Sequence, residues 1–82
     1  MKTVVVTGSA RGFGYAMIEL FYQKNYNVVL CDINEEELNH AKEKLSKLTS
    51  KGKILAYKMD VTKEEDIQSL IEKVLKEVKT ID

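Results

Sequence analysis

The sequence predicts an α/β fold in which a three-stranded parallel sheet lies between two layers of helices. Two short runs, Val4–Val6 and Val28–Cys31, are apolar at every position, as expected of parallel strands that are covered on both faces. Each run is followed by a longer segment with apolar residues at helical spacing. A third strand and a third helix continue the alternation, so the predicted order is βαβαβα.

The first strand leads into a glycine-rich segment, Thr7–Gly14, which carries the most specific motif of the chain. Its glycines are Gly8, Gly12 and Gly14, in the pattern T-G-x-x-x-G-x-G. Such glycines let the chain turn sharply off a strand and let the backbone N–H groups of a helix N-terminus approach a pyrophosphate. A buried strand, a glycine turn and a helix together are typical of a dinucleotide-binding βαβ unit.

The next two elements are a helix and a second buried strand. The helix is expected from about Phe13 to Lys24, and Asn25 is a helix stop. Its apolar stripe is predicted to contain Phe13, Ala16, Met17, Leu20 and Phe21. The second strand is predicted at Tyr26–Asp32, again with a continuous apolar centre.

Asn34 is predicted to cap the second helix, with Glu37 at the reach-back position of the cap. The apolar stripe of this helix is Leu38, Ala41, Leu45 and Leu48, and Gly52 ends the segment. The third strand is predicted at Lys53–Asp60, with alternating faces. Thr62 and Glu65 predict a capping box for a third helix, whose stripe is Ile67, Leu70, Ile71, Val74, Leu75 and Val78.

Right-handed crossovers place the second strand beside the first and the third strand beyond it. The predicted sheet order is therefore 3-2-1. The first two helices are expected on one face of the sheet and the third helix on the other. No repeat, low-complexity segment or linker divides residues 1–82, which are expected to form one domain.

Composition limits the function classes. Thirteen Lys and Arg residues balance 13 Asp and Glu residues, which argues against a nucleic-acid partner. No apolar run approaches the ~18 residues of a membrane span, and Met1 leads directly into the first strand, with no room for a signal peptide. The single Cys31 cannot form an internal disulfide and no Cys/His set has metal-ligand spacing, so a cytoplasmic protein without a metal site is expected.

The Thr7–Gly14 segment resembles the cofactor loop of the classical short-chain dehydrogenases/reductases, and the resemblance extends along the whole chain. It implies a Rossmann-like αβα domain that binds NAD(P). Asp32 ends the second strand 18 residues beyond Gly14, close to the spacing of about 20 for the acid that binds the adenosine ribose hydroxyls. In the family, an Asp-Val or Asp-Leu pair after the third strand binds adenine, and Asp60 and Val61 stand there.

The predicted cofactor-binding residues are Gly8, Ser9, Arg11, Gly12, Phe13, Gly14, Asp32, Ile33, Asp60 and Val61. NAD is favoured over NADP, because a carboxylate about 4 Å from a phosphate costs roughly 4 kcal/mol at an effective dielectric constant of about 20. Arg11 is the counterargument, since a basic residue in this loop holds the 2′-phosphate in some NADP-using relatives. Without a ligand, Asp32 is a strand-end acid, Asp60 a solvated turn acid and Arg11 an exposed cation.

The family's catalytic tyrosine, followed four residues later by a lysine, is absent, as is its Asn-Asn-Ala-Gly motif. The four tyrosines are followed at that distance by Glu19, Tyr26, Leu30 and Val61. The chain ends at Ile81–Asp82, where the resemblance implies that a fourth strand begins. We therefore expect a partial domain, the N-terminal part of an enzyme that oxidises alcohols or reduces carbonyls, without catalysis of its own. The alternative is a natural nucleotide-binding or assembly module.

The implied fourth strand would neighbour the first. In its absence Val4–Val6 would lie at a sheet edge, and the third helix would be partly uncovered. Unpaired strand edges are templates for association. We expect self-association, either through this edge or by exchange of the third helix, and weak binding of adenine nucleotides.

Overall fold

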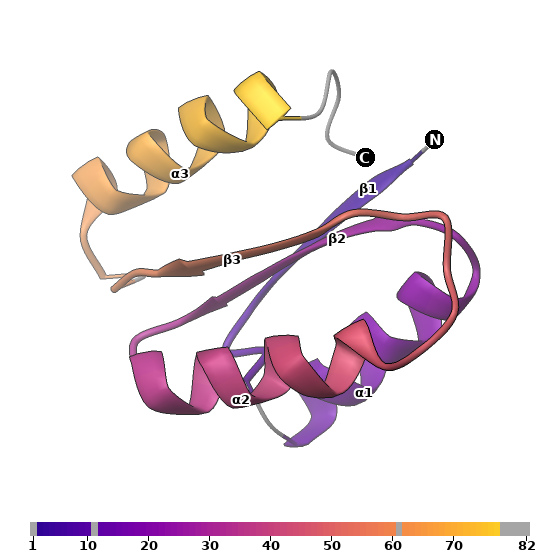
Figure 1. The fold of residues 1–82 in the computed structure, drawn as a ribbon. Coiled ribbons are helices and arrows are strands. Elements are labelled where there is room, and N and C mark those ends of the chain that lie inside the picture. The colour runs from indigo at the N-terminus through magenta and orange to yellow at the C-terminus, as the bar shows by residue number, and fades with distance from the viewer. Residues whose placement is uncertain (1, 11, 61, 78–82) are drawn as a thin grey trace.

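The computed structural model describes residues 2–10, 12–60 and 62–77. Strands and helices alternate along the chain (Figure 1), and the six elements are β1 (Thr3–Thr7), α1 (Gly12–Gln23), β2 (Asn27–Asp32), α2 (Glu35–Ser46), β3 (Ile54–Lys58) and α3 (Glu64–Glu77). The three strands are parallel and lie in the order β1-β2-β3, which confirms the predicted topology. The main difference in bounds is at β3, which ends two residues before Asp60.

The parallel register places corresponding strand ends at one edge of the sheet. Val5 of β1 is level with Val29 of β2, which is level with Leu55 of β3. β2 is buried at every position except its last residue, because it has a neighbouring strand on each side and a helix layer on each face. The residues that follow the three strands therefore come together above the same edge.

Two apolar cores lie on opposite faces of the sheet, as the helix layers in Figure 1 indicate. The core under α1 and α2 is built from Ile18, Tyr22, Val28, Leu30, Leu38, Ala41 and Leu45. The core under α3 is built from Val29, Cys31, Met59, Leu70 and Val74. Alternate residues of a strand point to opposite faces, so β2 supplies both cores. The predicted distribution of the helices is confirmed.

Helix α1 buries a different stripe from the predicted one. Ile18 is fully buried and Tyr22 nearly so, and both continue the stripe that begins at Gly14, at i+4 and i+8. A Cβ atom on Gly14 would lie 2.6 Å from the carbonyl oxygen of Gly8. The exposed apolar side chains of this helix are Phe13, Met17 and Leu20, at 82%, 37% and 52% exposure. Of the predicted stripe only Phe21 packs against the core, because the close backbone contact at Gly14 selects a different face.

The N-terminus of α2 is capped as predicted. Asn34 has an extended backbone and its side-chain oxygen accepts a hydrogen bond from the Glu37 N–H at 3.0 Å. Three glutamates occupy the first turn, where negative charge is favourable. The cap therefore fixes where the chain turns from β2 into α2.

The start of α3 differs from the prediction of a Thr62–Glu65 capping box. The helix begins at Glu64, and the Thr62 hydroxyl donates to the Asp60 carboxylate at 2.6 Å. The Asp66 carboxylate accepts from the Asp60 N–H at 3.1 Å. The Lys63 carbonyl accepts from the Asp66 and Ile67 N–H groups, so Lys63 stands at the N-cap position and Thr62 lies one residue too early to cap the helix. The prediction that Val78 extends the apolar stripe lies outside the described residues.

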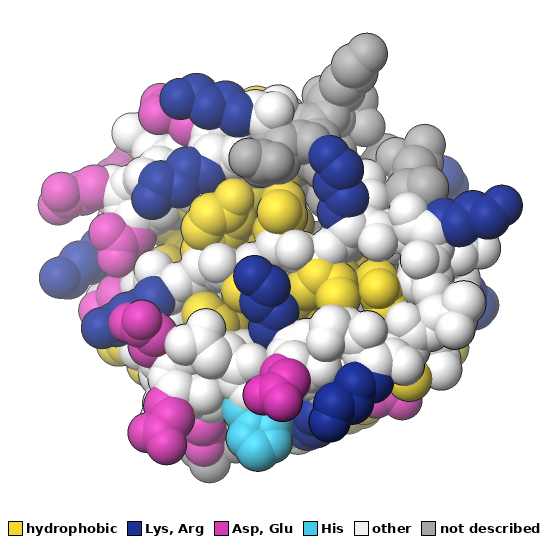
Figure 2. Space-filling view, viewed as in Figure 1, with side chains coloured by type: hydrophobic (Ala, Val, Ile, Leu, Met, Phe, Trp, Pro, Cys, Tyr) yellow, Lys and Arg dark blue, Asp and Glu magenta, His cyan; other side chains and the backbone are white. Residues whose placement is uncertain are grey.

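The surface shows where the two helix layers leave the sheet uncovered. Figure 2 shows hydrophobic side chains reaching the surface between the layers, within a rim of charged side chains. Across the described residues, no helix has both the length and the apolar character that a membrane span requires.

Candidate functional site

The ends of three adjacent strands border one crevice of about 170 Å³. Its walls are formed by Gly8, Cys31, Asp32, Ile33, Met59 and Asp60. Gly8 follows β1, Asp32 ends β2 and Asp60 lies just beyond β3. In open α/β sheets, ligands bind outside the carboxyl ends of the strands. The structure thus places Gly8, Asp32 and Asp60 around one crevice, whereas Gly12, which was expected to face it together with the two acids, is not part of its lining.

Glycine is required at the three positions of this loop for two different structural reasons. Gly8 and Gly12 have φ angles of +63° and +64°, a left-handed conformation that side chains disfavour. A Cβ atom at either position would meet nothing within 4 Å, so the backbone above the loop is open to approach. Glycine is required at position 14 because Gly14 packs closely against Gly8 and Ser9, which leaves no room for a Cβ atom. Gly12 does not line the crevice but begins α1 at its side.

The Asp32 carboxylate connects the glycine loop to the end of β2. One oxygen accepts a hydrogen bond from the Ala10 N–H at 3.2 Å. The other oxygen accepts from the Asn34 N–H at 3.1 Å. An ionised carboxylate has about four acceptor positions, so two remain for further donors. Asp32 is therefore a fixed, partly satisfied acceptor at the wall of the crevice.

Ser9 has a structural role that the sequence did not indicate. Its side chain is fully buried, and its hydroxyl oxygen accepts from the Cys31 N–H at 3.0 Å. The Ser9 N–H donates to the Cys31 carbonyl at 3.1 Å. These two bonds extend the pairing between the β1 end and β2 into the glycine loop. The hydroxyl oxygen therefore already has a partner within the chain, and a contact between Ser9 and a cofactor stays a prediction.

Asp60 is the second acid of the crevice, and its neighbours keep it ionised. Its carboxylate accepts from both the hydroxyl and the N–H of Thr62, at 2.6 and 2.9 Å. These hydrogen bonds, and to a smaller extent the charge of Lys63, hold the pKa of Asp60 below its ordinary value of 3.8. The crevice therefore carries two carboxylates from neighbouring strands and, among the described residues that line it, no cation.

The other predicted site residues are divided between the crevice and the open surface. Ile33 lines the crevice while remaining 62% exposed, so it offers an apolar surface at the mouth. Phe13 is 82% exposed on α1 and does not line the crevice. Arg11 and Val61 lie outside the described residues.

A second hollow, which the sequence reasoning missed, lies between the glycine loop and α2. It has a volume of about 400 Å³ and is lined by Ala10, Asn34, Glu36, Glu37, His40, Ala41 and Lys44. The ammonium group of Lys44 lies 4.3 Å above the Tyr15 ring, a cation–π contact between α2 and α1. The sequence contained one signal for this hollow, because the spacing of Glu37, Ala41 and Lys44 places these residues on one face of α2.

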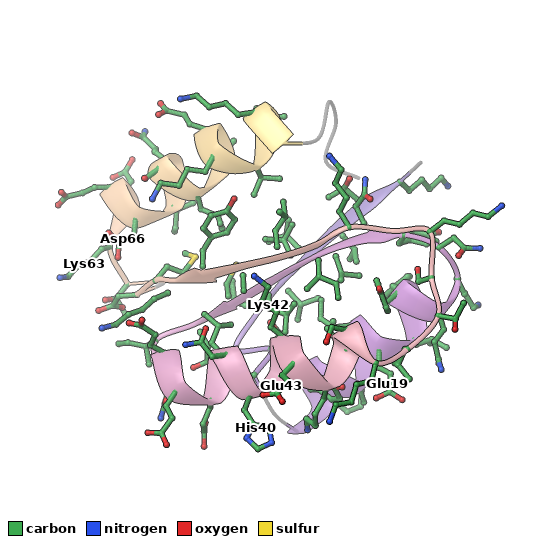
Figure 3. All side chains as sticks on the ribbon, in the orientation of Figure 1. Glu19, His40, Lys42, Glu43, Lys63 and Asp66 are labelled. Atoms are coloured by element: carbon green, nitrogen blue, oxygen red, sulfur yellow. The ribbon has the colours of Figure 1, made fainter. Side chains whose placement is uncertain are left out.

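His40 lies on the outer side of α2 and points away from the sheet (Figure 3). Its side chain is exposed. Within the part of the chain that the structure describes, no group of three or more His, Cys, Asp and Glu residues is arranged to hold a metal ion.

The topology and the crevice define a class of protein before any comparison. A parallel αβα sheet with a glycine turn after β1 belongs to the doubly wound α/β proteins, which bind ligands outside the strand ends. The family model described as short chain dehydrogenase matches residues 2–82. The chain belongs to the short-chain dehydrogenase/reductase family.

Relatives and solved structures agree with this assignment. The short chain dehydrogenase/reductase dpmpG of Macrophomina phaseolina is 37% identical over 81 residues, which are 99% of this chain and 46% of the relative. NAD⁺-bound xylitol dehydrogenase superposes with a TM-score of 0.90 at 26% identity, covering 99% of this chain and 30% of that one. L-sorbose reductase from Gluconobacter frateurii, complexed with NADPH and L-sorbose, gives 0.89 at 27% identity, with coverages of 99% and 30%. The chain spans less than half the length of each.

Proposed function

We propose that this chain forms the adenosine side of an NAD-binding site in a short-chain oxidoreductase. The observation that carries the proposal is the single crevice bordered by Gly8, Asp32 and Asp60. The oxidoreductase would interconvert an alcohol and a carbonyl, and the bound nicotinamide would supply or accept the hydride. That activity would belong to a longer polypeptide, because these 82 residues lack the tyrosine–lysine pair of the family.

Each part of the nucleotide has a matching group on this chain. The two remaining acceptor positions of Asp32 suit the two hydroxyls of the adenosine ribose. Ile33 offers an apolar surface for the adenine ring, and Asp60 an ionised acceptor for its exocyclic amine. The open backbone at Gly12, at the positive end of α1, suits the pyrophosphate. Arg11 and Val61 are included in the proposal on the sequence alone.

The choice of NAD over NADP rests on the charge around Asp32. A 2′-phosphate would lie close to this carboxylate, at a cost of roughly 4 kcal/mol for a separation of about 4 Å at an effective dielectric constant of about 20. Ile33 follows where a cation would offset that cost, and Lys44 is directed at the Tyr15 ring instead. The two named structures contain NAD⁺ and NADPH respectively, so the family allows either coenzyme.

Calorimetric titration of the chain with NAD, NADP and AMP tests the proposal. NAD is expected to bind more tightly than NADP, and Asp32→Asn is expected to weaken NAD binding about tenfold, the cost of roughly one charged hydrogen bond. NADP binding should weaken less, because repulsion is also removed. Glu36→Gln, which removes one exposed negative charge from the start of α2, serves as the control. Stronger binding of NADP than NAD to the unmodified chain would contradict the assignment.

The alternative function is a nucleotide-binding or assembly module without catalysis, favoured by the apolar surface that α1 and α3 expose. The coding sequence downstream of residue 82 separates the two. An in-frame Tyr-x-x-x-Lys supports the oxidoreductase, and a stop codon supports the module. A cytoplasmic location is part of both proposals and is supported by the free thiol of Cys31, which suits a reducing compartment.

A further inference from the structure

The backbone of Asp60 lies between two hydrogen bonds that run to different elements. The Met59 N–H donates to the Asp32 carbonyl at 3.0 Å, which ties the end of β3 to the end of β2. The next N–H along the chain, that of Asp60, donates to the Asp66 carboxylate of α3 at 3.1 Å. The second acid of the crevice is therefore held between the first acid and the first turn of α3.

Asp66 differs from the other acids in the first turn of α3. Glu64 and Glu65 are exposed, whereas Asp66 is half-buried and lies where the chain arrives from β3 (Figure 3). In a capping box, the acid at the third helical position accepts from the N-cap N–H. Here the N-cap is Lys63, and its N–H donates to the Asp60 carbonyl at 3.0 Å. Asp66 instead reaches six residues back, so its bond connects the helix to the wall of the crevice.

The side chain of Asp60 is oriented by a separate pair of bonds. Its Oδ1 atom accepts from both the N–H and the hydroxyl of Thr62, and no described residue donates to its Oδ2 atom. With the backbone fixed by Asp66 and Oδ1 fixed by Thr62, the direction of Oδ2 is determined. An ionised carboxylate can only accept hydrogen bonds, so Oδ2 is suited to a donor such as the exocyclic amine of adenine.

We propose that Asp66 is a positioning residue for adenine recognition, because its bond to the Asp60 N–H holds the Asp60 carboxylate in place relative to Asp32. The inference rests on the proposed nucleotide site and gives a role to a residue that does not line the crevice. Asp66 touches no part of the nucleotide and acts through Asp60 alone. Its loss should therefore weaken selection for the exocyclic amine and leave the ribose contacts of Asp32 in place.

Calorimetric titration with two nucleotides tests this role. The probes are AMP and purine riboside 5′-monophosphate, which differs from AMP only by the absence of the exocyclic amine. The unmodified chain is expected to bind AMP about tenfold more tightly, the value of roughly one charged hydrogen bond. In Asp66→Ala this ratio should fall to about twofold, because AMP binding weakens while binding of the analogue changes little.

Two further variants separate the hydrogen bond from the charge. Asp66→Asn keeps an oxygen that can accept from the Asp60 N–H and should restore the ratio to nearly tenfold, although it lacks the same charge as Asp66→Ala. Glu65→Ala removes one charge from an exposed position in the same turn and should leave the ratio unchanged. A purely structural role of Asp66 would weaken the binding of both nucleotides equally. The far-ultraviolet circular dichroism spectrum verifies that each variant is folded.

Hydrogen exchange tests the bond itself and needs no substitution. The Asp60 amide should exchange slowly in the unmodified chain and in Asp66→Asn, and rapidly in a folded Asp66→Ala chain. An Asp60 amide that exchanges rapidly in the unmodified chain would overturn the proposal, whatever the stability of the variants.

The titrations distinguish failure of this inference from failure of the proposed function. If the tenfold ratio persists in a folded Asp66→Ala chain, Asp60 is oriented without Asp66 and only the positioning role is wrong. Equal binding of the two nucleotides to the unmodified chain would mean that Asp60 does not contact the base. If neither nucleotide binds the unmodified chain, the proposed nucleotide site is wrong, and the role of Asp66 is wrong with it.

Discussion

Gly14 shows how one absent side chain selects the buried face of a helix. Its position against Gly8 and Ser9 starts the stripe that Ile18 and Tyr22 continue. The sequence of α1 is apolar on nearly every side, so periodicity alone gives little information about orientation. The third glycine of the motif, which must touch the strand end, was the better guide to the buried stripe.

Gly14→Ala sets two effects against each other. Alanine favours a helix over glycine by about 1 kcal/mol, but its Cβ would meet the Gly8 oxygen at 2.6 Å and the Ser9 Cα at 3.0 Å. Backbone atoms move only with strain, so we expect a net loss of roughly 2–3 kcal/mol in the free energy of unfolding. Urea denaturation measures it, and Gln23→Ala, at an exposed position of the same helix, is the control. A more stable Gly14→Ala variant would contradict the packing role.

The sequence predicted the parts of the site whose positions follow from the order of the strands. It did not predict the parts that depend on hydrogen bonds between side chains and distant backbone groups. Parallel strands in a known order must bring Gly8, Asp32 and Asp60 to one edge, and the sequence contains that order. The partner of the Ser9 hydroxyl is the N–H of Cys31, 22 positions away, and no local pattern signals such a bond. The same holds for the bond between the Ala10 N–H and Asp32.

At the scale of elements, the two helix starts that were predicted from capping rules had different outcomes. Asn34 caps α2 because it stands directly before Glu35, the first helical residue, and its side-chain oxygen accepts from the Glu37 N–H. At α3 the same rule failed, because the helix begins at Glu64 and Lys63, not Thr62, stands at the N-cap position. A capping rule identifies a suitable side chain from the local sequence, whereas the structure decides which residue stands at the helix boundary.

Asn34→Ala is expected to lower the free energy of unfolding by about 1 kcal/mol, because it leaves the Glu37 N–H without its side-chain acceptor. The bond from the Asn34 N–H to Asp32 involves only the backbone of Asn34 and should persist. Asn39→Ala, at an exposed interior position of α2, is the matched control and should change stability by less than about 0.5 kcal/mol. Equal losses in the two variants, measured by urea denaturation, would show that the cap contributes nothing.

At the scale of the whole molecule, the burial of β2 shows how completely the two helix layers enclose the sheet. Val28, Val29, Leu30 and Cys31 each have no exposed surface. The strand order and the sides of the helices followed from handedness and from the unbroken apolar runs. The surfaces left open on α1 and α3 were only partly predicted, because the stripe of α1 was placed wrongly.

The reactivity of the Cys31 thiol measures how completely the helix layers enclose the sheet. Burial, assisted by the negative charge of Asp32, raises the pKa of its thiol from 9.0 to about 12. At pH 8 only about one thiol in ten thousand is then a reactive thiolate. We expect a disulfide reagent such as Ellman's reagent to leave the folded chain unmodified and to label it rapidly in concentrated urea. Rapid labelling without urea would contradict a closed pair of layers.

Asp32 has a structural role that does not depend on a bound nucleotide, because its carboxylate accepts hydrogen bonds from the N–H groups of Ala10 and Asn34. Natural selection would therefore retain this acid for the shape of the loop as well as for the choice of coenzyme. A homologue that no longer bound the coenzyme would therefore still keep Asp32. The presence of this residue in a distant homologue would then indicate common ancestry and would not by itself indicate coenzyme binding.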